Sequence, residues 1–230
     1  PRGFNNGLLF LIPKTNLPDV LDLRPISVTN TDNRIISAAI KIPLDSLLSK
    51  FIHEEQTAFL SRRKIESNII FFNKLMHDAA KDKSDLYLLL LDFRKAFDNI
   101  SHDLILATLR HLNFPPWFLN AYTALISNVR VFMTKPFLTN RFIDILRGVK
   151  QGDPLPPLIF LIVLDPLLHK FLRAKAKHGF ARINPRGFAD DVAISFASLR
   201  FSLSVIRPIL DKYTLASGSH LNMKKSLLLS

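Results

Sequence analysis

Residues 86–92 of the chain read LYLLLLD, an unbroken apolar run that ends in the carboxylate of Asp92. A continuous run of this length, with no polar alternation, is typical of a strand that is buried on both faces of a sheet. Two short β-prone runs within residues 182–196 flank a second acidic feature, the pair Asp190 and Asp191. These runs predict a hairpin with the acidic pair at its turn. The sequence therefore predicts a sheet that carries carboxylates at one edge.

The rest of the chain reads mainly as helices. Six segments are predicted to be helical, from the spacing of their apolar residues or from acidic residues and proline near their starts: 31–50, 65–80, 101–112, 115–126, 158–177 and 203–216. Residues 8–12 and 129–134 are expected to be strands, and residues 17–25 a loop. Pro43 is expected to kink or break the first helix. This order predicts an α+β fold, with helices on one face of a sheet.

Composition narrows the kind of protein. The chain has 230 residues and is 48% hydrophobic, enough for one large globular domain or two small ones. Its 31 basic and 19 acidic residues give a net charge of +12. Such a charge favours a polyanionic partner, because basic surfaces gain affinity by releasing counterions from phosphates. A basic surface that only keeps the protein soluble is the simpler alternative.

The sequence also bears on the compartment. It contains no cysteine, which excludes disulfides and thiolate zinc sites and fits a reducing environment. No signal peptide is visible, and the longest strongly apolar run, residues 158–164, is far short of the roughly 20 residues that span a bilayer. We expect an intracellular protein, in the nucleus or the cytoplasm, without a membrane partner.

Three carboxylates at one sheet edge would repel each other unless a cation neutralised them. Magnesium prefers a few carboxylates together with waters and substrate phosphates. Two such ions about 4 Å apart can hold both the attacking and the leaving oxygen of a phosphoryl transfer. The alternative is structural, because aspartate favours turns and often caps strands. Spacing alone leaves both interpretations open.

The residues around the acids carry a resemblance to a known family. Three blocks occur in order: DFRKAFD at residues 92–98, RGVKQGDPL at residues 147–155 and FADD at residues 188–191. Further blocks agree with them: LIPK at 11–14, LRPIS at 23–27, QTAF at 56–59 and LNMKKS at 221–226. Together they resemble the reverse transcriptase domain of non-LTR (LINE-type) retrotransposons, to which the group II intron reverse transcriptases are related.

This resemblance implies a right-hand polymerase fold with an antiparallel palm sheet. Residues 1–85 would form the fingers and residues 86–230 the palm with the helices that join it to the fingers. The chain is expected to end before the primer grip and thumb, and therefore to synthesise poorly on its own. The implied reaction is RNA-directed DNA synthesis during retrotransposition. Its partners would be an RNA template, a DNA primer and dNTPs, and its cofactor two Mg²⁺ ions, which Mn²⁺ could replace.

The resemblance also implies roles for individual residues. The catalytic residues would be Asp92, Asp190, Asp191 and Lys225, the lysine donating a proton to the leaving pyrophosphate. The metal ligands would be Asp92, Phe93, Asp190 and Asp191. The dNTP contacts would be Lys14, Arg63, Phe97, Gln151 and Gly152, with Phe97 blocking a ribose 2′-OH. The nucleic-acid contacts would be Arg24, Asn68, Lys150 and Pro154. A core position for Phe97 and solvated surface positions for the basic side chains are the structural alternatives.

Three positions depart from the family pattern. Ala58 and Arg62 stand where relatives usually have glycine, and each would cost stability if its backbone φ is positive. Pro156 replaces a usual serine but suits the start of a helix. These departures keep open a catalytically impaired relic that only folds or binds nucleic acid. An RNA-dependent RNA polymerase is the other alternative, against which Phe97 argues.

Overall fold

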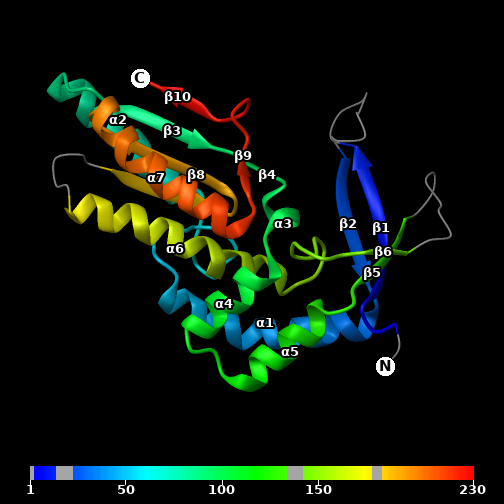
Figure 1. Ribbon diagram of the computed structural model, residues 1–230. Coiled ribbons are helices and arrows are strands. Elements are labelled where there is room, and N and C mark those ends of the chain that lie inside the picture. Colours follow the sequence, from blue (N-terminus) through cyan, green and yellow to red (C-terminus); the bar gives the residue numbers. More distant parts are fainter. Residues whose placement is uncertain (1–2, 14–22, 134–141, 178–182) are drawn as a thin grey trace.

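The computed structural model describes residues 3–13, 23–133, 142–177 and 183–230 (Figure 1). The strands are β1 (Asn6–Pro13), β2 (Leu23–Thr29), β3 (Tyr87–Leu91), β4 (Phe93–Arg94), β5 (Arg130–Met133), β6 (Phe142–Asp144), β7 (Asn184–Phe188), β8 (Asp191–Phe196), β9 (His220–Leu221) and β10 (Leu227–Leu229). The helices are α1 (Thr31–Phe51), α2 (Glu66–Asp82), α3 (Ala96–Asn99), α4 (His102–His111), α5 (Pro116–Ile126), α6 (Pro156–Lys177) and α7 (Leu199–Ser217). The expected α+β composition is confirmed.

The first of two four-stranded sheets carries the acidic residues. Its strand order is β10-β3-β8-β7, and every neighbouring pair is antiparallel. The predicted hairpin is present, since β7 and β8 pair up to Phe188 and Asp191. The prediction that residues 86–92 are buried on both faces is wrong, because within β3 only Leu91 is fully buried. The reason is that one face of this sheet packs on the core while the other borders a cavity.

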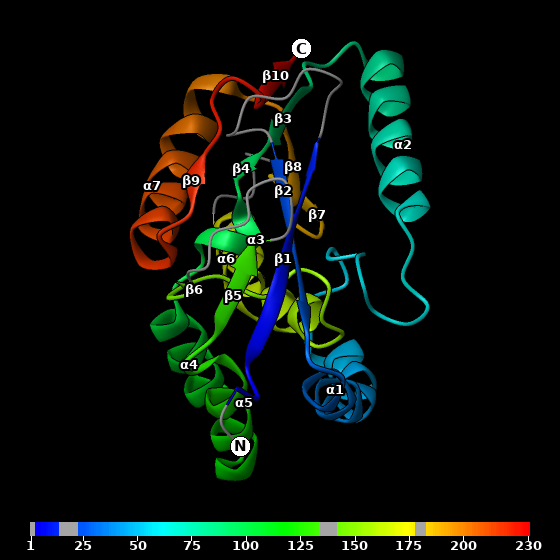
Figure 2. The same ribbon diagram turned by 90° about the vertical axis from the view of Figure 1, so that its right-hand side faces the viewer.

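Helices α6 and α7 cover the packed face. Helix α6 contributes a long run of buried residues, 158–164, and its Phe160 and Phe171 join Phe196 of β8 among the largest fully buried side chains. Removing this much apolar surface from water is the main force that holds the sheet to the helices. Figure 2 shows the sheet between α7 on one side and α2 on the other. The helix α2 therefore faces the open side of the sheet.

The second sheet has the order β2-β1-β5-β6 and stands apart from the first (Figure 1). Its β1 and β5 are parallel, whereas the other two pairs are antiparallel. The pairing of β1 with β5 joins a strand from residues 1–85, the expected fingers, to a strand from residues 86–230, the expected palm. One backbone hydrogen bond, from Ser27 N–H to Gln151 O at 3.0 Å, ties this sheet to the loop before α6.

Several local predictions need correction. Residues 23–25, expected in a loop, belong to β2, because pairing with β1 supplies hydrogen bonds that the local sequence does not signal; residues 17–22 lie outside the described part of the chain. Helix α1 continues through Pro43 without a break. Pro43 and Ala39 are both exposed, so water can bind the carbonyl that loses its helical partner. Within the described ranges, no helix has both the length and the apolar character needed to cross a membrane.

Candidate active site

A cavity of about 500 Å³ lies between the open face of the first sheet and α2. Its polar lining comes from both sides and from the C-terminal segment: Asn68, Asp92, Arg186, Asp191 and Lys225. Apolar side chains of α2, β3, β7, β8 and β10, together with Ile65 just before α2, form the rest of the wall. The cavity is therefore an apolar hollow in which two carboxylates meet basic side chains.

Asp92 is held by the segment that contains the lysine block. Its backbone N–H donates to Ser226 Oγ at 3.2 Å, and its backbone C=O accepts from Asn222 N–H at 2.8 Å. These two contacts bracket Lys225, whose exposed side chain lines the same cavity as Asp92. The structure therefore brings Asp92 and Lys225 together, although 133 positions separate them in sequence.

The hairpin turn presents the second carboxylate. Ala189 occupies the turn with a positive φ of 56°, and Asp191 begins β8 on the cavity side. Burial raises the pKa of the Asp191 carboxyl, and the negative charge of Asp92 raises it further. Asp190 is half-buried in the turn and is not among the residues that line the cavity. Two of the three expected acids thus share the site.

Two carboxylates are the negatively charged ligands that this cavity offers to a divalent cation. Among the described residues, no group of three or more acidic or histidine side chains is placed to hold a metal ion. Asp92 and Asp191 nevertheless repel each other at an apolar wall, and a cation would relieve that repulsion. Magnesium needs only a few carboxylates when waters and phosphates complete its shell. The residues present therefore fit a divalent ion that is shared with a phosphate substrate.

The glycine-containing loop before α6 is fixed by α3 and its flanks. Val149 N–H donates to Phe97 O at 2.7 Å, and the Gln151 side chain donates to Asp98 Oδ1 at 2.9 Å. Gly152 has a φ of +104°, and a Cβ there would lie 2.9 Å from Ser27 O. Glycine is required at this position because both the conformation and the space exclude a side chain. The loop thereby joins the two sheets.

Phe97 lies half-buried on α3. Its ring stacks on Phe160 of α6 at 4.3 Å between centroids, and Phe59 meets it edge-on at 6.4 Å. The aromatic is thus both part of the core edge and partly exposed, which agrees with the structural alternative and leaves the sugar-gate role a prediction. Its rigid support would suit a steric gate, since a loosely held ring could move away from a 2′-OH.

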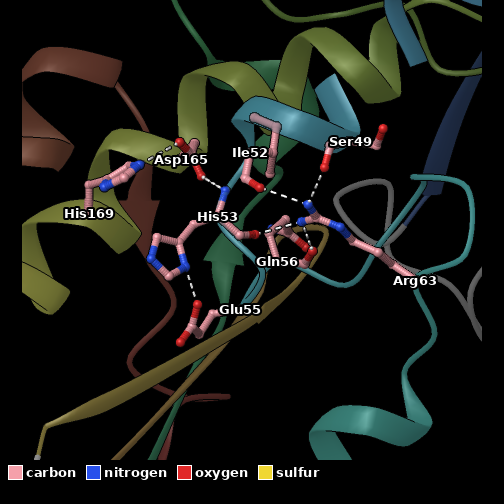
Figure 3. Close-up of polar contacts among 8 residues, drawn as sticks. All are labelled: Ser49, Ile52, His53, Glu55, Gln56, Arg63, Asp165 and His169. Atoms are coloured by element: carbon pink, nitrogen blue, oxygen red, sulfur yellow. Dashed lines mark hydrogen bonds and ion pairs between the residues drawn. The ribbon is translucent and has the colours of Figure 1, made fainter. Parts of the chain in front are cut away.

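Arg63 caps the end of α1. Its two terminal nitrogens donate four hydrogen bonds of 2.6–3.0 Å to backbone carbonyls, those of Ser49, Ile52, His53 and Gln56 (Figure 3). Desolvation lowers the pKa of Arg63, while Asp165 and two nearby glutamates raise it in part. The structure gives this residue a helix-capping role that sequence reasoning missed. Its contact with a triphosphate stays a prediction.

The other predicted contact residues occupy varied positions. Lys150 Nζ is buried without a hydrogen-bond partner among the described residues, and its pKa falls to about 8 through desolvation. Asn68 is buried and donates to Thr57 Oγ1 and Gly187 O at 2.8 and 3.1 Å. Arg24 is exposed on β2 and Pro154 is half-exposed. The backbone of Phe93 is engaged in the short pairing of β4 with β9, and Lys14 lies outside the described residues.

Comparison with known proteins defines the class. The fold resembles telomerase from Candida tropicalis, with a TM-score of 0.72 at 13% identity over 98% of this chain and 41% of that one. For an apo form of that telomerase, truncated from its C-terminal domain, the TM-score is 0.70 at 14% identity, over 98% of this chain and 50% of that one. The fold is therefore that of a right-hand polymerase.

Sequence comparison gives the family. The profile described as reverse transcriptase (RNA-dependent DNA polymerase) matches residues 12–230. The R2DM Pol polyprotein of Drosophila melanogaster is 32% identical over 208 residues, which are 90% of this chain and 19% of the relative. The transposon TX1 149 kDa protein of Xenopus laevis is 29% identical over 231 residues, which are 98% of this chain and 18% of the relative.

The chain therefore belongs to the reverse transcriptase family, and its relatives are polyproteins of non-LTR retrotransposons. It spans about a fifth of the length of these two relatives. The resemblance noted from the sequence blocks is confirmed.

Proposed function

We propose that the chain copies RNA into DNA by adding deoxynucleotides to the 3′-OH of a primer, in the service of retrotransposition. The observation that carries the proposal is the cavity that Asp92, Asp191 and Lys225 all line, with the charge of Asp92 acting on Asp191, in a member of the reverse transcriptase family. The proposed partners are an RNA template, a DNA primer and dNTPs, and the proposed compartment is the nucleus or cytoplasm of the host cell.

The chemistry assigns each side chain a task. Asp92 and Asp191, with Asp190 beside them and the backbone of Phe93, would hold two Mg²⁺ ions, and Mn²⁺ would replace them. When bound, such ions lower the cost of bringing an anionic triphosphate to a hydroxyl. Lys225, which lines the same cavity, would donate a proton to leaving pyrophosphate.

The surrounding residues would select and orient the substrates. Phe97, held by Phe160, would exclude a ribose 2′-OH, and Gln151 and Gly152 would pack against the incoming nucleotide. Arg24 is an exposed candidate for template contact. We further propose that residues 1–85 are fingers and residues 86–230 palm, with the palm-encoded β5 and β6 completing the fingers sheet.

Incorporation of one deoxynucleotide on an RNA template with a DNA primer tests the proposal. We expect incorporation that requires Mg²⁺, stops on chelation and falls by on the order of 10³-fold in Asp92→Asn, because the substitution removes a charged ligand of the proposed metal ions. Asp85→Asn, at an exposed position just before β3, serves as the matched control and should keep wild-type activity. A wild-type protein that incorporates nothing under these conditions would contradict the proposal and favour the relic.

The choice of sugar separates this function from RNA synthesis. Wild type should prefer dNTPs, and Phe97→Ala should lower the preference over rNTPs by up to about 10²-fold, the discrimination that a hydrophobic pocket can give against one added hydroxyl. A wild-type preference for rNTPs would point instead to an RNA-dependent RNA polymerase.

A further inference from the structure

The amide of Gln56 lies against the turn that carries the acidic pair. Its Oε1 accepts the backbone N–H of Ala189 at 3.1 Å, and its Nε2 donates to the backbone C=O of the same residue at 3.3 Å. One side chain thus satisfies both polar backbone groups of Ala189. Gln56 is fully buried, with a relative exposure of 0%, so water cannot replace it.

The turn needs such a partner. Ala189 adopts a positive φ of 56°, a conformation that costs a residue with a side chain about 1–2 kcal/mol. Strained backbone of this kind persists only where the surroundings fix it. Ala189 directly precedes Asp190 and Asp191, so a change in its backbone would move both carboxylates.

The neighbouring residues are arranged around this contact. The backbone of the Gln56 segment runs alongside β7, with Gly187 N–H donating to Glu55 O at 2.8 Å and Thr57 N–H donating to Gly187 O at 2.9 Å. A Cβ at Gly187 would lie 2.9 Å from Gln56 Nε2, so glycine leaves the space that the amide occupies.

The segment itself is braced from behind. Arg63 donates to the backbone carbonyl of Gln56 at 2.8 Å and to that of His53 at 2.6 Å (Figure 3). His53 N–H in turn donates to Asp165 Oδ1 of α6 at 3.0 Å. The glutamine is therefore fixed to both α1 and α6, and it can transmit that rigidity to the hairpin.

We propose that Gln56 is a positioning residue for catalysis: its amide fixes the Ala189 turn and thereby sets where Asp190 and Asp191 stand relative to Asp92. The expected effect of Gln56 on kcat rests on the proposed function, whereas its effect on the backbone of the Ala189 turn does not. A glutamine that merely joined two parts of the molecule would change stability and leave the kcat of the folded protein unaltered.

Amide hydrogen exchange tests the contact without any activity. In the full 230-residue chain, Gln56→Met keeps the size of the side chain and removes both hydrogen bonds to Ala189. We expect the Ala189 N–H to exchange at least about tenfold faster than in wild type, since it loses its acceptor. Thr57→Val, which removes a neighbouring buried hydroxyl that bonds Gly187 O at 3.2 Å, should leave Ala189 protected. Unchanged exchange at Ala189 in Gln56→Met would overturn the inference.

Kinetics test the catalytic consequence. Single-nucleotide incorporation by Gln56→Met should show a kcat lower by on the order of 10²-fold, the effect of displacing reacting groups by about 1 Å. The KM for the dNTP should stay within about twofold, and Thr57→Val should retain the wild-type kcat. Equal kcat values for Gln56→Met and wild type would overturn the positioning role. A wild-type chain that incorporates nothing would refute the proposed function, and exchange at Ala189 would then decide the contact alone.

The variant Gln56→Glu tests the donor role of Nε2 through the pH dependence of kcat. It also replaces Gln56→Met as the test if that variant does not fold. A protonated glutamic acid can donate to Ala189 O as the amide does, but an ionised one cannot. Burial raises the pKa of such a carboxyl, so the kcat of Gln56→Glu relative to wild type should rise as the pH falls from about 8 to about 6. A ratio that is constant with pH would contradict the donor role of Nε2.

Discussion

Arg62 has a positive backbone φ, a conformation that destabilises a residue with a side chain. The resemblance to the family led us to expect glycine at this position, and the φ of Arg62 is 68°. Ala58, the other such position, does not have a positive φ; its neighbour Phe59 does, at 58°. The expectation of strain is therefore confirmed for Arg62 and wrong for Ala58, because the turn takes its left-handed residue one position later.

Replacing Arg62 with glycine should stabilise the protein. The left-handed conformation costs about 1–2 kcal/mol, and part of the gain is lost to the greater freedom of glycine in the unfolded chain, so we expect a net gain of about 0.5–1 kcal/mol. Chemical denaturation measures it. Arg62→Ala keeps the Cβ and should give no gain; an equal gain in both variants would show that φ is not the cause.

Lys150 is a buried cation whose charge opposes folding. Its pKa is about 8 in the folded protein and 10.5 as a free side chain, so between these values the unfolded chain binds more protons than the folded one. The stability contributed by this group therefore rises as the pH increases from about 8 to 10.5. Below pH 8 the folded protein carries the full cost of the buried charge, which Asp153 offsets only in part.

Lys150→Met should consequently stabilise the protein at pH 7 by about 3 kcal/mol, since one pKa unit corresponds to about 1.4 kcal/mol and the fall in pKa from 10.5 to about 8 already includes the attraction to Asp153. The gain should shrink as the pH rises from about 8 to 10.5 and disappear above 10.5, where the lysine is neutral in both states. Denaturation at pH 7 and pH 10 checks this. A gain that is the same at both pH values would show that packing, rather than charge, is responsible.

At the scale of elements, the end of α1 depends on Arg63. A helix leaves its last carbonyls without internal partners, and the planar guanidinium serves four acceptors in and just after this turn. Arg63→Lys retains the charge but cannot make the forked contacts. We expect a loss of about 2–3 kcal/mol, which thermal or chemical denaturation would record.

The adjacent Arg62→Lys is the matched control for this change, because Arg62 is exposed and should tolerate lysine within about 0.5 kcal/mol. If Arg63→Lys left stability unchanged but raised the KM for dNTPs, the capping role would be contradicted and the triphosphate contact supported.

The elements also show what sequence could predict. Strand β3, the β7–β8 hairpin and the long helices follow from local patterns, namely apolar runs and turn residues. Neither β2 nor β6 was predicted as a strand. Both lie at the edges of their sheet, Pro25 interrupts the apolar pattern of β2, and β6 is only three exposed residues long. At the site, the sequence blocks singled out Asp92 and Asp191 as candidate metal ligands. The hydrogen bonds between Gln56 and Ala189, and those from Arg63 to the end of α1, became visible only in the fold.

At the scale of the whole molecule, the charge of +12 predicts how nucleic acid should bind. If about six phosphates are neutralised, the affinity for an RNA–DNA primer–template should fall roughly 10³-fold between 50 and 200 mM salt. Fluorescence anisotropy over that range measures the slope. An affinity that does not change with salt would contradict binding through the basic surface.

The central claim is that the carboxylates at the cavity between α2 and the antiparallel sheet form a divalent cation site. The most direct measurement is a Mn²⁺ titration followed by electron paramagnetic resonance, in the presence of a dNTP. We predict that Asp92→Asn and Asp191→Asn each weaken Mn²⁺ binding by at least about tenfold, since each removes one of the few carboxylate ligands. The exposed control Asp85→Asn should bind as wild type does. Equal affinities in wild type, Asp92→Asn and Asp191→Asn would contradict the account.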